Sequence, residues 1–217
     1  MSFLSDWGGW LPSLLNGLLV SLKLTALSLG LGLPLGLALA LGSASPNRAL
    51  KTVVILLVEI GRGTPALVML QVLYFGLPSS GLTLAAILSA GLSLALTTGA
   101  YTSEIIRGGL QAVPTGEVEA GEALGMSRHD SLRFVIIPQG LRIAIPALLG
   151  FCITIFQATS LAYTIALPEL LGRAYSIGSE TFQNLSVLTL AGLMYVAITV
   201  PASVLVGRME RRLSRHL

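Results

Sequence analysis

The feature that most constrains this chain is a series of apolar segments, each long enough for a helix that crosses a lipid bilayer. Such a helix needs roughly 20 mainly apolar residues. The segments run over about residues 18–41, 53–77, 82–106, 144–167 and 185–206. The sequence therefore predicts an all-α membrane protein with about five transmembrane helices, forming a single transmembrane domain over residues 1–217.

Composition supports this class and excludes a soluble domain. Hydrophobic residues make up 53% of the 217 residues and charged residues only 11%, which is more apolar surface than a soluble fold can bury. The opening stretch "MSFLSDWGGWLPS" has no basic region, so we interpret it as leading into a mature span rather than as a cleaved signal. Glycines such as those in "GLGLPLGLALALG" are expected either at close helix contacts or as ordinary transmembrane composition.

The placement of Lys and Arg predicts the orientation in the membrane. Basic residues near the ends of spans favour the cytoplasmic side. They cluster after the first, third and fifth predicted spans, whereas the segments on the opposite side contain only Arg173. We therefore expect the N-terminus outside and the C-terminus in the cytoplasm. The net charge of +3 follows from this topology and gives no reason to expect nucleic acid as a partner.

The loop at about residues 107–143, between the third and fourth predicted spans, carries a short helix in its sequence pattern. Thr115 is the expected N-cap, acidic residues favour the positive N-terminal end, and Gly125 is the expected left-handed residue at the C-terminal end. Pro138 and Pro146 frame the start of the fourth span. On physical grounds alone, such a helix is more often a plain connection than a functional element.

The residues of this loop resemble a known motif. "EAGEALGMSRHDSLRFVIIPQ" is similar to the cytoplasmic signature of importer permease subunits in the ATP-binding cassette (ABC) superfamily, which reads Glu-Ala-Ala, three residues, Gly, nine residues, Ile, one residue, Leu-Pro. The positions that match are Glu119, Ala120, Gly125 and Pro138. The positions that depart are Gly121, Val135 and Ile137. Of these departures, only Gly121 is expected to affect the structure, because glycine slightly lowers the stability of a helix.

Further segments resemble the polar amino-acid branch of these permeases (the histidine/glutamine/arginine type). They are "RGTPALVMLQVLYFGLP", "AYTSEIIRGGLQAVP", "ALGMS", "PQGLRIAIPALLG" and "TSLAYTIALPELL". Many members carry Lys-Asp immediately before Thr-Ser-Leu, where this chain has Gln157 and Ala158. A substrate contact based on charge is therefore in doubt at this point.

The resemblance implies a type I ABC importer permease fold and a set of partners. These are a nucleotide-binding ATPase subunit, a second permease subunit in a homodimer or heterodimer, an extracytoplasmic substrate-binding protein and a polar amino acid, in a multi-pass protein of the bacterial cytoplasmic (inner) membrane. The sequence contains no G-x-x-x-x-G-K-[ST] phosphate loop, so ATP and Mg are expected in the partner ATPase and the chain is expected to be no enzyme and to bind no cofactor itself. The residues expected to couple to the ATPase are Glu117, Glu119, Ala120, Gly121, Glu122, Gly125 and Pro138.

Polar side chains inside predicted spans need a partner or an aqueous path. The candidates for the substrate path are Gln157, Thr159, Ser160 and Tyr163 in the fourth span, and Glu59 and Arg62 in the second. Two alternatives stay open: the hydroxyls bond only the carbonyls of the preceding turn, and Glu59 and Arg62 form a structural ion pair. Glu104 and Arg107 have the same three-residue spacing and are expected to pair, and Lys23 is expected to snorkel outward.

Two residues in the outer loop after the fourth span also stay open. Glu169 and Arg173, at i and i+4, either form a local pair or contact the binding protein.

Two classes of function survive. In the first, the chain is the translocating half of an ATP-driven importer that works by alternating access. In the second, it is a membrane scaffold or signalling subunit that docks a cytoplasmic partner, which the absence of an appended soluble domain disfavours. A membrane enzyme has little support, because His129 and His216 lack metal-ligand spacing and the single Cys152 offers no cysteine metal site.

Overall fold

The computed structural model describes residues 6–213, and within them every regular element is helical. The predicted all-α class is therefore confirmed. The elements are α1 (Trp7–Ser43), α2 (Arg48–Gly63), α3 (Ala66–Gln71), a π-helical turn (Val72–Gly76), a 3₁₀ turn (Leu77–Ser80), α4 (Ala86–Gln111), α5 (Thr115–Ala123), α6 (Arg128–Asp130), a second π-helical segment (Ser131–Ile136), α7 (Ile137–Ala158), a second 3₁₀ segment (Thr159–Ile165), α8 (Leu170–Thr181) and α9 (Asn184–Leu213).

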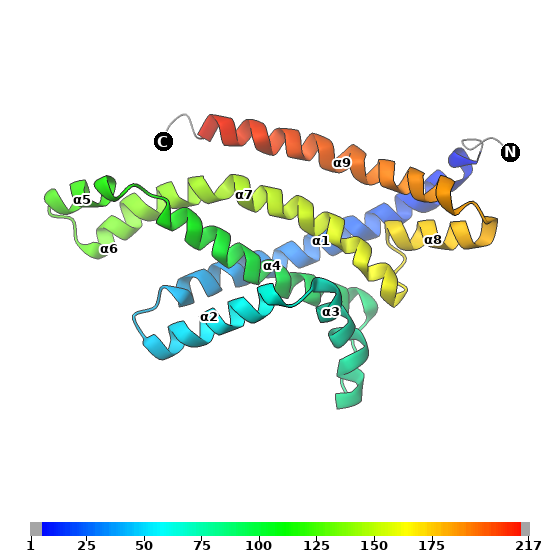
Figure 1. Ribbon diagram of the computed structural model, residues 1–217, viewed down its shortest axis with the longest axis horizontal. Helices are drawn as coiled ribbons and strands as arrows, with labels where there is room; N and C mark the ends of the chain where they lie inside the picture. The colour runs from blue at the N-terminus through cyan, green and yellow to red at the C-terminus, as the bar shows by residue number, and fades with distance from the viewer. Residues whose placement is uncertain (1–5, 214–217) are drawn as a thin grey trace.

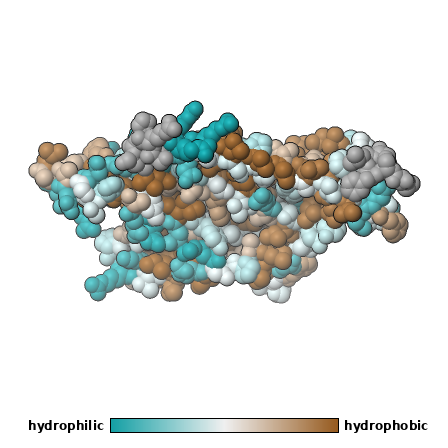
Figure 2. Space-filling model, turned by 45° about the horizontal axis from the view of Figure 1, so that its top comes forward, coloured by the Kyte–Doolittle hydropathy of each residue, from teal (hydrophilic) through white to brown (hydrophobic). Residues whose placement is uncertain are grey.

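The long helices α1, α4, α7 and α9 run roughly along the longest axis of the molecule (Figure 1). Helix α4 is central and packs on α1, α2 and α7. The start of α1 lies at the same end as α8, and α5 and α6 lie at the opposite end (Figure 1). In Figure 2, hydrophobic residues line much of the upper edge on the α8 side, and hydrophilic residues are densest in the half that contains α5.

Small residues let α1 and α4 approach each other closely. A Cβ atom added at Gly32 would lie 2.4 Å from Thr98, and one added at Gly36 would lie 2.0 Å from the Thr102 hydroxyl. Gly91 of α4 is similarly tight against Leu27. Contacts of this kind let membrane helices gain packing energy that lipid does not supply. The close-contact interpretation of the glycines therefore holds at this interface.

The predicted spans agree with the helices to different degrees. Among the described residues, three continuous helical stretches are long and apolar enough to cross a membrane, namely Trp7–Ser43, Arg128–Ile165 and Asn184–Leu213. They contain the first and fifth predicted spans and all of the fourth except its last two residues. Helix α4 contains most of the third but does not meet the same criterion, because glycine, serine and threonine dilute its apolar character. Its crossing of the membrane stays a prediction.

The second predicted span is not one continuous helix. Helix α2 ends at Gly63, α3 begins at Ala66, and the two are bent by 99°. The cause is local, because Pro65 has no N–H to donate and its ring pushes the preceding residue out of the helical region. Thr64 accordingly has an extended backbone, with ψ of 123°. The expected span over residues 53–77 is thus a broken pair.

Candidate functional site

Helix α5 ends as the sequence predicts but begins differently. Gly125 has a φ of 78°, the left-handed conformation that favours glycine. The N–H of Gly125 donates to the Glu122 carbonyl at 2.9 Å, and the N–H of Met126 donates to the Gly121 carbonyl at 3.0 Å. The two bonds close the helix in a Schellman motif. The predicted cap at Thr115 is wrong: Pro114 occupies the N-cap position, without a side-chain cap, and Thr115 is the first helical residue.

Few contacts hold α5 against the rest of the chain. Gly121 is buried, and a Cβ atom there would lie 3.1 Å from the Ser131 hydroxyl and 3.2 Å from the Met126 sulfur. Glycine at this position therefore lets α5 pack close to the second π-helical segment. This close packing explains why glycine is found here, although it lowers the helix propensity. The second tie is the Gln139 amide, which donates to the Glu117 carboxylate at 3.4 Å.

Most of the predicted coupling residues lie on the open side of α5. Glu117, Glu119, Ala120 and Glu122 are exposed, and the neighbouring Leu124 is 85% exposed. Pro138 is exposed at the second position of α7, inside the continuous helical stretch Arg128–Ile165, where its missing N–H interrupts the helical hydrogen bonds directly after the π-helical segment. The exposed side of α5 is thus acidic, with an exposed leucine at its C-terminal end.

Four charged residues form a chain of ion pairs between α2 and α4. The Arg62 guanidinium lies 3.3 Å from the Glu59 carboxylate and 3.7 Å from that of Glu104. Arg107 then donates two hydrogen bonds to Glu104, at 2.8 and 2.5 Å. The two predicted i, i+3 pairs are confirmed, and the link from Arg62 to Glu104 joins them into one network that the sequence did not predict.

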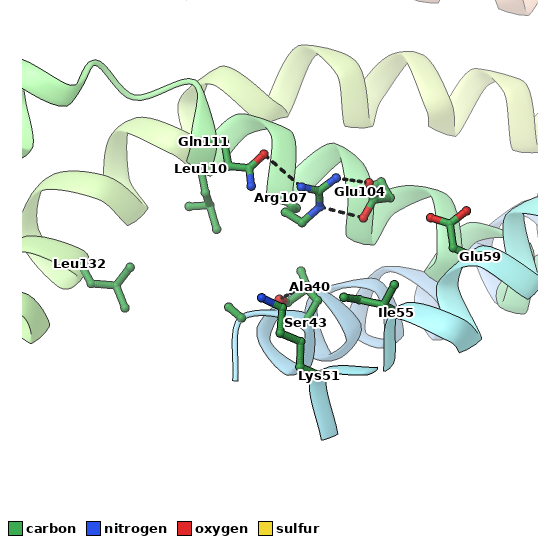
Figure 3. A pocket seen from close by; sticks show the side chains of 11 residues that line it. Ala40, Ser43, Lys51, Ile55, Glu59, Glu104, Arg107, Leu110, Gln111 and Leu132 are labelled. Carbon is green, nitrogen blue, oxygen red and sulfur yellow. Dashed lines mark hydrogen bonds and ion pairs between the residues drawn. The ribbon is translucent and has the colours of Figure 1, made fainter. Parts of the chain in front are cut away.

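This network borders a cavity of about 560 Å³ near the α5 end of the bundle. Figure 3 shows Arg107 between Glu104 and Gln111, with Lys51 on the other side of the cavity. Its lining residues are Ala40, Ser43, Ala44, Lys51, Ile55, Glu59, Glu104, Arg107, Leu110, Gln111 and Leu132. Because the acidic and basic side chains balance, the cavity has no net charge.

A second cavity, of about 390 Å³, opens at the break between α2 and α3. Tyr101 of α4 stacks on Phe151 of α7 with ring centroids 5.4 Å apart, and its hydroxyl donates to the Arg62 carbonyl at 3.2 Å. Both rings line the cavity together with Arg62, Gly63, Thr64, Pro65, Ala66, Leu94, Thr97, Thr154, Ile155 and Ala158. Sequence reasoning missed Tyr101, although a tyrosine in a helix of small residues was a visible signal.

The four polar candidates of the fourth span do not gather around one point. Gln157 is exposed beside Ala158 of the second cavity. The hydroxyls of Thr159 and Ser160 donate to carbonyls three residues earlier, at 2.7 and 2.8 Å, which is the structural alternative named above. Tyr163 lies elsewhere, stacked on Tyr175 of α8 with ring centroids 4.6 Å apart.

Glu169 has a role that sequence reasoning missed. Its side chain is fully buried and caps α8 by accepting from the N–H groups of Leu171 and Gly172 at 3.0 and 2.7 Å. It also accepts from the hydroxyls of Ser21 at 3.2 Å and Tyr195 at 3.1 Å. Burial raises the pKa of this carboxyl, and the four hydrogen bonds oppose that rise. The local Glu169–Arg173 pair left open by the sequence does not form.

The remaining candidates give no metal centre. Within residues 6–213, no group of three or more His, Cys, Asp or Glu side chains is placed to hold a metal ion. His129 is exposed in α6, and Cys152 is partly buried in α7. His216 lies outside the described residues.

A bundle of apolar helices with a broken helix, a cavity at the break and an exposed acidic helix at one end is consistent with a membrane permease, and the comparison with known families establishes that class. A family model described as "Binding-protein-dependent transport system inner membrane component" matches residues 32–215. The chain belongs to this family, whose members are the permease subunits of ATP-driven importers.

Several relatives share most of the chain. HisM, a histidine/lysine/arginine/ornithine transport system permease protein of Salmonella typhimurium, is 36% identical, covering 93% of this chain and 90% of its own length. TcyB, an L-cystine transport system permease protein of Bacillus subtilis, is 37% identical over 95% of this chain and 88% of its own.

Solved structures give the same result. A crystal structure of an amino acid ABC transporter with histidines matches with a TM-score of 0.94 and 34% identity, covering 98% of this chain and 99% of that one. An inward-facing methionine ABC transporter, MetNI, matches with a TM-score of 0.68 and 22% identity over 96% of this chain and 99% of its own, which is a likeness of fold alone.

Proposed function

We propose that this chain is the translocating half of an importer for a polar amino acid or a related zwitterion. The observation that carries the proposal is the broken α2–α3 helix beside a cavity of about 390 Å³. Inside a membrane, irregular backbone is tolerated only where protein buries it or where it lines a cavity, and broken helices often mark transport sites.

The chemistry of this cavity suits a small zwitterion. Arg62 lines the cavity with its guanidinium paired to Glu59 and Glu104, so a substrate carboxylate would exchange with one of these partners, and the carbonyl end of α2 supplies a partial negative charge. Tyr101 and Phe151 add flat apolar surfaces, and Thr97 and Thr154 add hydroxyls. Of the candidates for the substrate path, Arg62 lines this cavity, whereas Gln157 only precedes the lining residue Ala158 in sequence.

The energy for transport comes from a separate ATPase that docks on α5. Its exposed acidic face, with Glu119 and Glu122, fits basic groups on a partner, and Leu124 offers an apolar contact. ATP and Mg are bound by that ATPase. The relatives' names place amino acids with such systems, and the substrate of this chain is of the same class.

The assembly contains a second permease subunit and an extracytoplasmic binding protein in a bacterial cytoplasmic membrane. Helix α4 is the fifth membrane-crossing element, the N-terminus is outside and the C-terminus is cytoplasmic. Cysteine labelling tests this topology: a cysteine at Ser80 is expected to react from outside, and one at Ser127 only after permeabilisation. Labelling at Ser127 in intact cells would overturn it.

Reconstitution tests the function itself. The chain is placed in liposomes with its ATPase and its binding protein, and uptake of labelled polar amino acids is measured with and without internal ATP. ATP-dependent uptake is the expected result. A scaffold or signalling subunit would bind the ATPase and yet move no amino acid, which would refute the proposal.

A matched pair of variants tests the cavity. Tyr101→Phe removes the hydroxyl that bonds the Arg62 carbonyl at the helix break, so KM for uptake is expected to rise by up to about tenfold, as for the loss of one hydrogen bond. Tyr74→Phe makes the same change outside this cavity and is expected to leave KM unaltered. Equal effects of the two variants would remove the cavity from the substrate path.

A further inference from the structure

Helix α8 lies at the end of the molecule opposite α5 (Figure 1), in the segment predicted to face outside. It carries Arg173, the only Lys or Arg in the predicted outer segments of the sequence. Basic residues are disfavoured on that side. Arg173 is therefore the charge at this end of the molecule that the topology signal does not account for.

The acid nearest in sequence does not serve as this partner. The Glu169 carboxylate, four residues earlier, is buried among α8 amides, Ser21 and Tyr195. Among residues 6–213, the Arg173 guanidinium has no ion pair or hydrogen bond, and the residue is exposed. Its stem packs on α1, since a Cβ atom at Gly17 would lie 2.9 Å from the Arg173 Cγ. The fold thus positions this charge while leaving it free.

Arg173 borders a cavity of about 340 Å³. The stacked rings of Tyr163 and Tyr175 and the α8 residues Ser176 and Ser179 form other parts of its lining. Arginine and tyrosine are the residue types that dominate the energetic centres of protein interfaces. None of these residues lines the cavity at the helix break, so the two sites are separate.

We propose that this outer pocket receives an acidic side chain of the extracytoplasmic binding protein, with Arg173 as the cationic anchor. The inference rests on the proposed function, because it presumes a partner that delivers substrate from outside. A carboxylate entering the pocket would meet the planar guanidinium at its edge, and that guanidinium is the donor group the pocket offers, because the Ser176 and Ser179 hydroxyls already donate to Glu180 and to the Tyr175 carbonyl.

Binding of the purified binding protein to the permease–ATPase complex in nanodiscs tests the proposal. Arg173→Gln is expected to weaken binding by about tenfold or more, and Arg173→Glu further, because an unpaired carboxylate would remain at the interface. Arg142→Gln, which removes an exposed arginine of α7 outside this pocket, is the matched control and is expected to leave Kd unchanged. An acidic-to-lysine change in the binding protein that restores binding to Arg173→Glu would identify the partner residue.

Other outcomes overturn the proposal in distinguishable ways. If the wild-type complex imports amino acids and the Arg173 variants bind the binding protein normally, the anchor is wrong and the proposed function stands. If Arg173→Gln raises KM for uptake while Kd for the binding protein is unchanged, the pocket holds the free substrate instead. If the wild-type complex neither binds the binding protein nor imports, both proposals fail. Gel filtration of each variant with its ATPase checks that the fold is intact.

Discussion

The two short helices α8 and α5 lie at opposite ends of the molecule (Figure 1) and are attached in opposite ways. Helix α8 is tied to α1 and α9 by the fully buried Glu169 through Ser21 and Tyr195. Helix α5 is held by the close approach at Gly121 and by one exposed hydrogen bond from Gln139.

The difference separates an element built into the fold from the element that we propose as the docking site for the ATPase. Buried hydrogen bonds are costly to leave unmade, so α8 is expected to open only with the surrounding bundle. Elements with few buried contacts and exposed hydrogen bonds open at lower free energy. Helix α5 is of this kind, which suits a surface that docks an ATPase and changes position during a transport cycle.

The largest effect is expected at the α8 end. Glu169→Ala leaves two α8 amides and the hydroxyls of Ser21 and Tyr195 without their acceptor, so unfolding free energy is expected to fall by about 3 kcal/mol. Thermal unfolding in detergent measures the loss. Glu180→Ala is the matched control, because among the described residues that exposed carboxylate accepts a hydrogen bond from Ser176 alone. Equal melting temperatures for the two variants would contradict the comparison of the two ends.

The contrast between local and long-range contacts also explains which features of the structure could be predicted from the sequence. The ion pairs Glu59–Arg62 and Glu104–Arg107 and the left-handed Gly125 depend on neighbours within a helical turn, so local spacing was enough to predict them. The apolar helices α1 and α9 were predicted by length and hydropathy in the same way. Coupling residues on α5 came from a motif that is itself local.

Contacts between residues far apart in the sequence could not be predicted from it. Glu169 meets Ser21, 148 residues away, and no local pattern reports which hydroxyl will face a buried acid. The same holds for the bridge from Arg62 to Glu104 and for Tyr101, whose hydroxyl bonds a carbonyl of α2. The 99° break shows the intermediate case: Pro65 marks its position, but the angle depends on packing.

A second variant tests the α5 end. A change there is expected to leave the fold stable but to disturb the coupling to the ATPase. Gly125→Val forces a β-branched residue into a left-handed conformation, at about 1 kcal/mol or more. No other atom lies within 4 Å of the added Cβ, so the penalty comes from the backbone alone. We expect weaker ATPase binding, or fewer substrate molecules moved per ATP, with little change in the melting of the bundle.

The control for this variant is Gly116→Val, which adds the same side chain to α5 where the space is also open and the backbone is helical. Pull-down of the ATPase and uptake in proteoliposomes report the two readouts. A normal transport ratio in Gly125→Val would make α5 a plain connection.

The smallest effect is expected where α5 packs on the second π-helical segment, and measuring it shows how tightly α5 is held. Gly121→Ala gains roughly 0.5–1 kcal/mol of helix propensity but brings a Cβ atom within 3.1 Å of the Ser131 hydroxyl, so the two effects nearly cancel. That hydroxyl is buried and has no hydrogen-bond partner in the part of the chain that the structure describes. Ser131→Ala therefore removes no hydrogen bond and relieves the close contact.

The double variant is expected to be more stable than Gly121→Ala. The coupling between the two sites is measured by a double-mutant cycle of melting or hydrogen exchange in α5. Additive effects would mean that α5 already moves freely over the π-helical segment, and the attachment at this end would be weaker still than the contacts indicate.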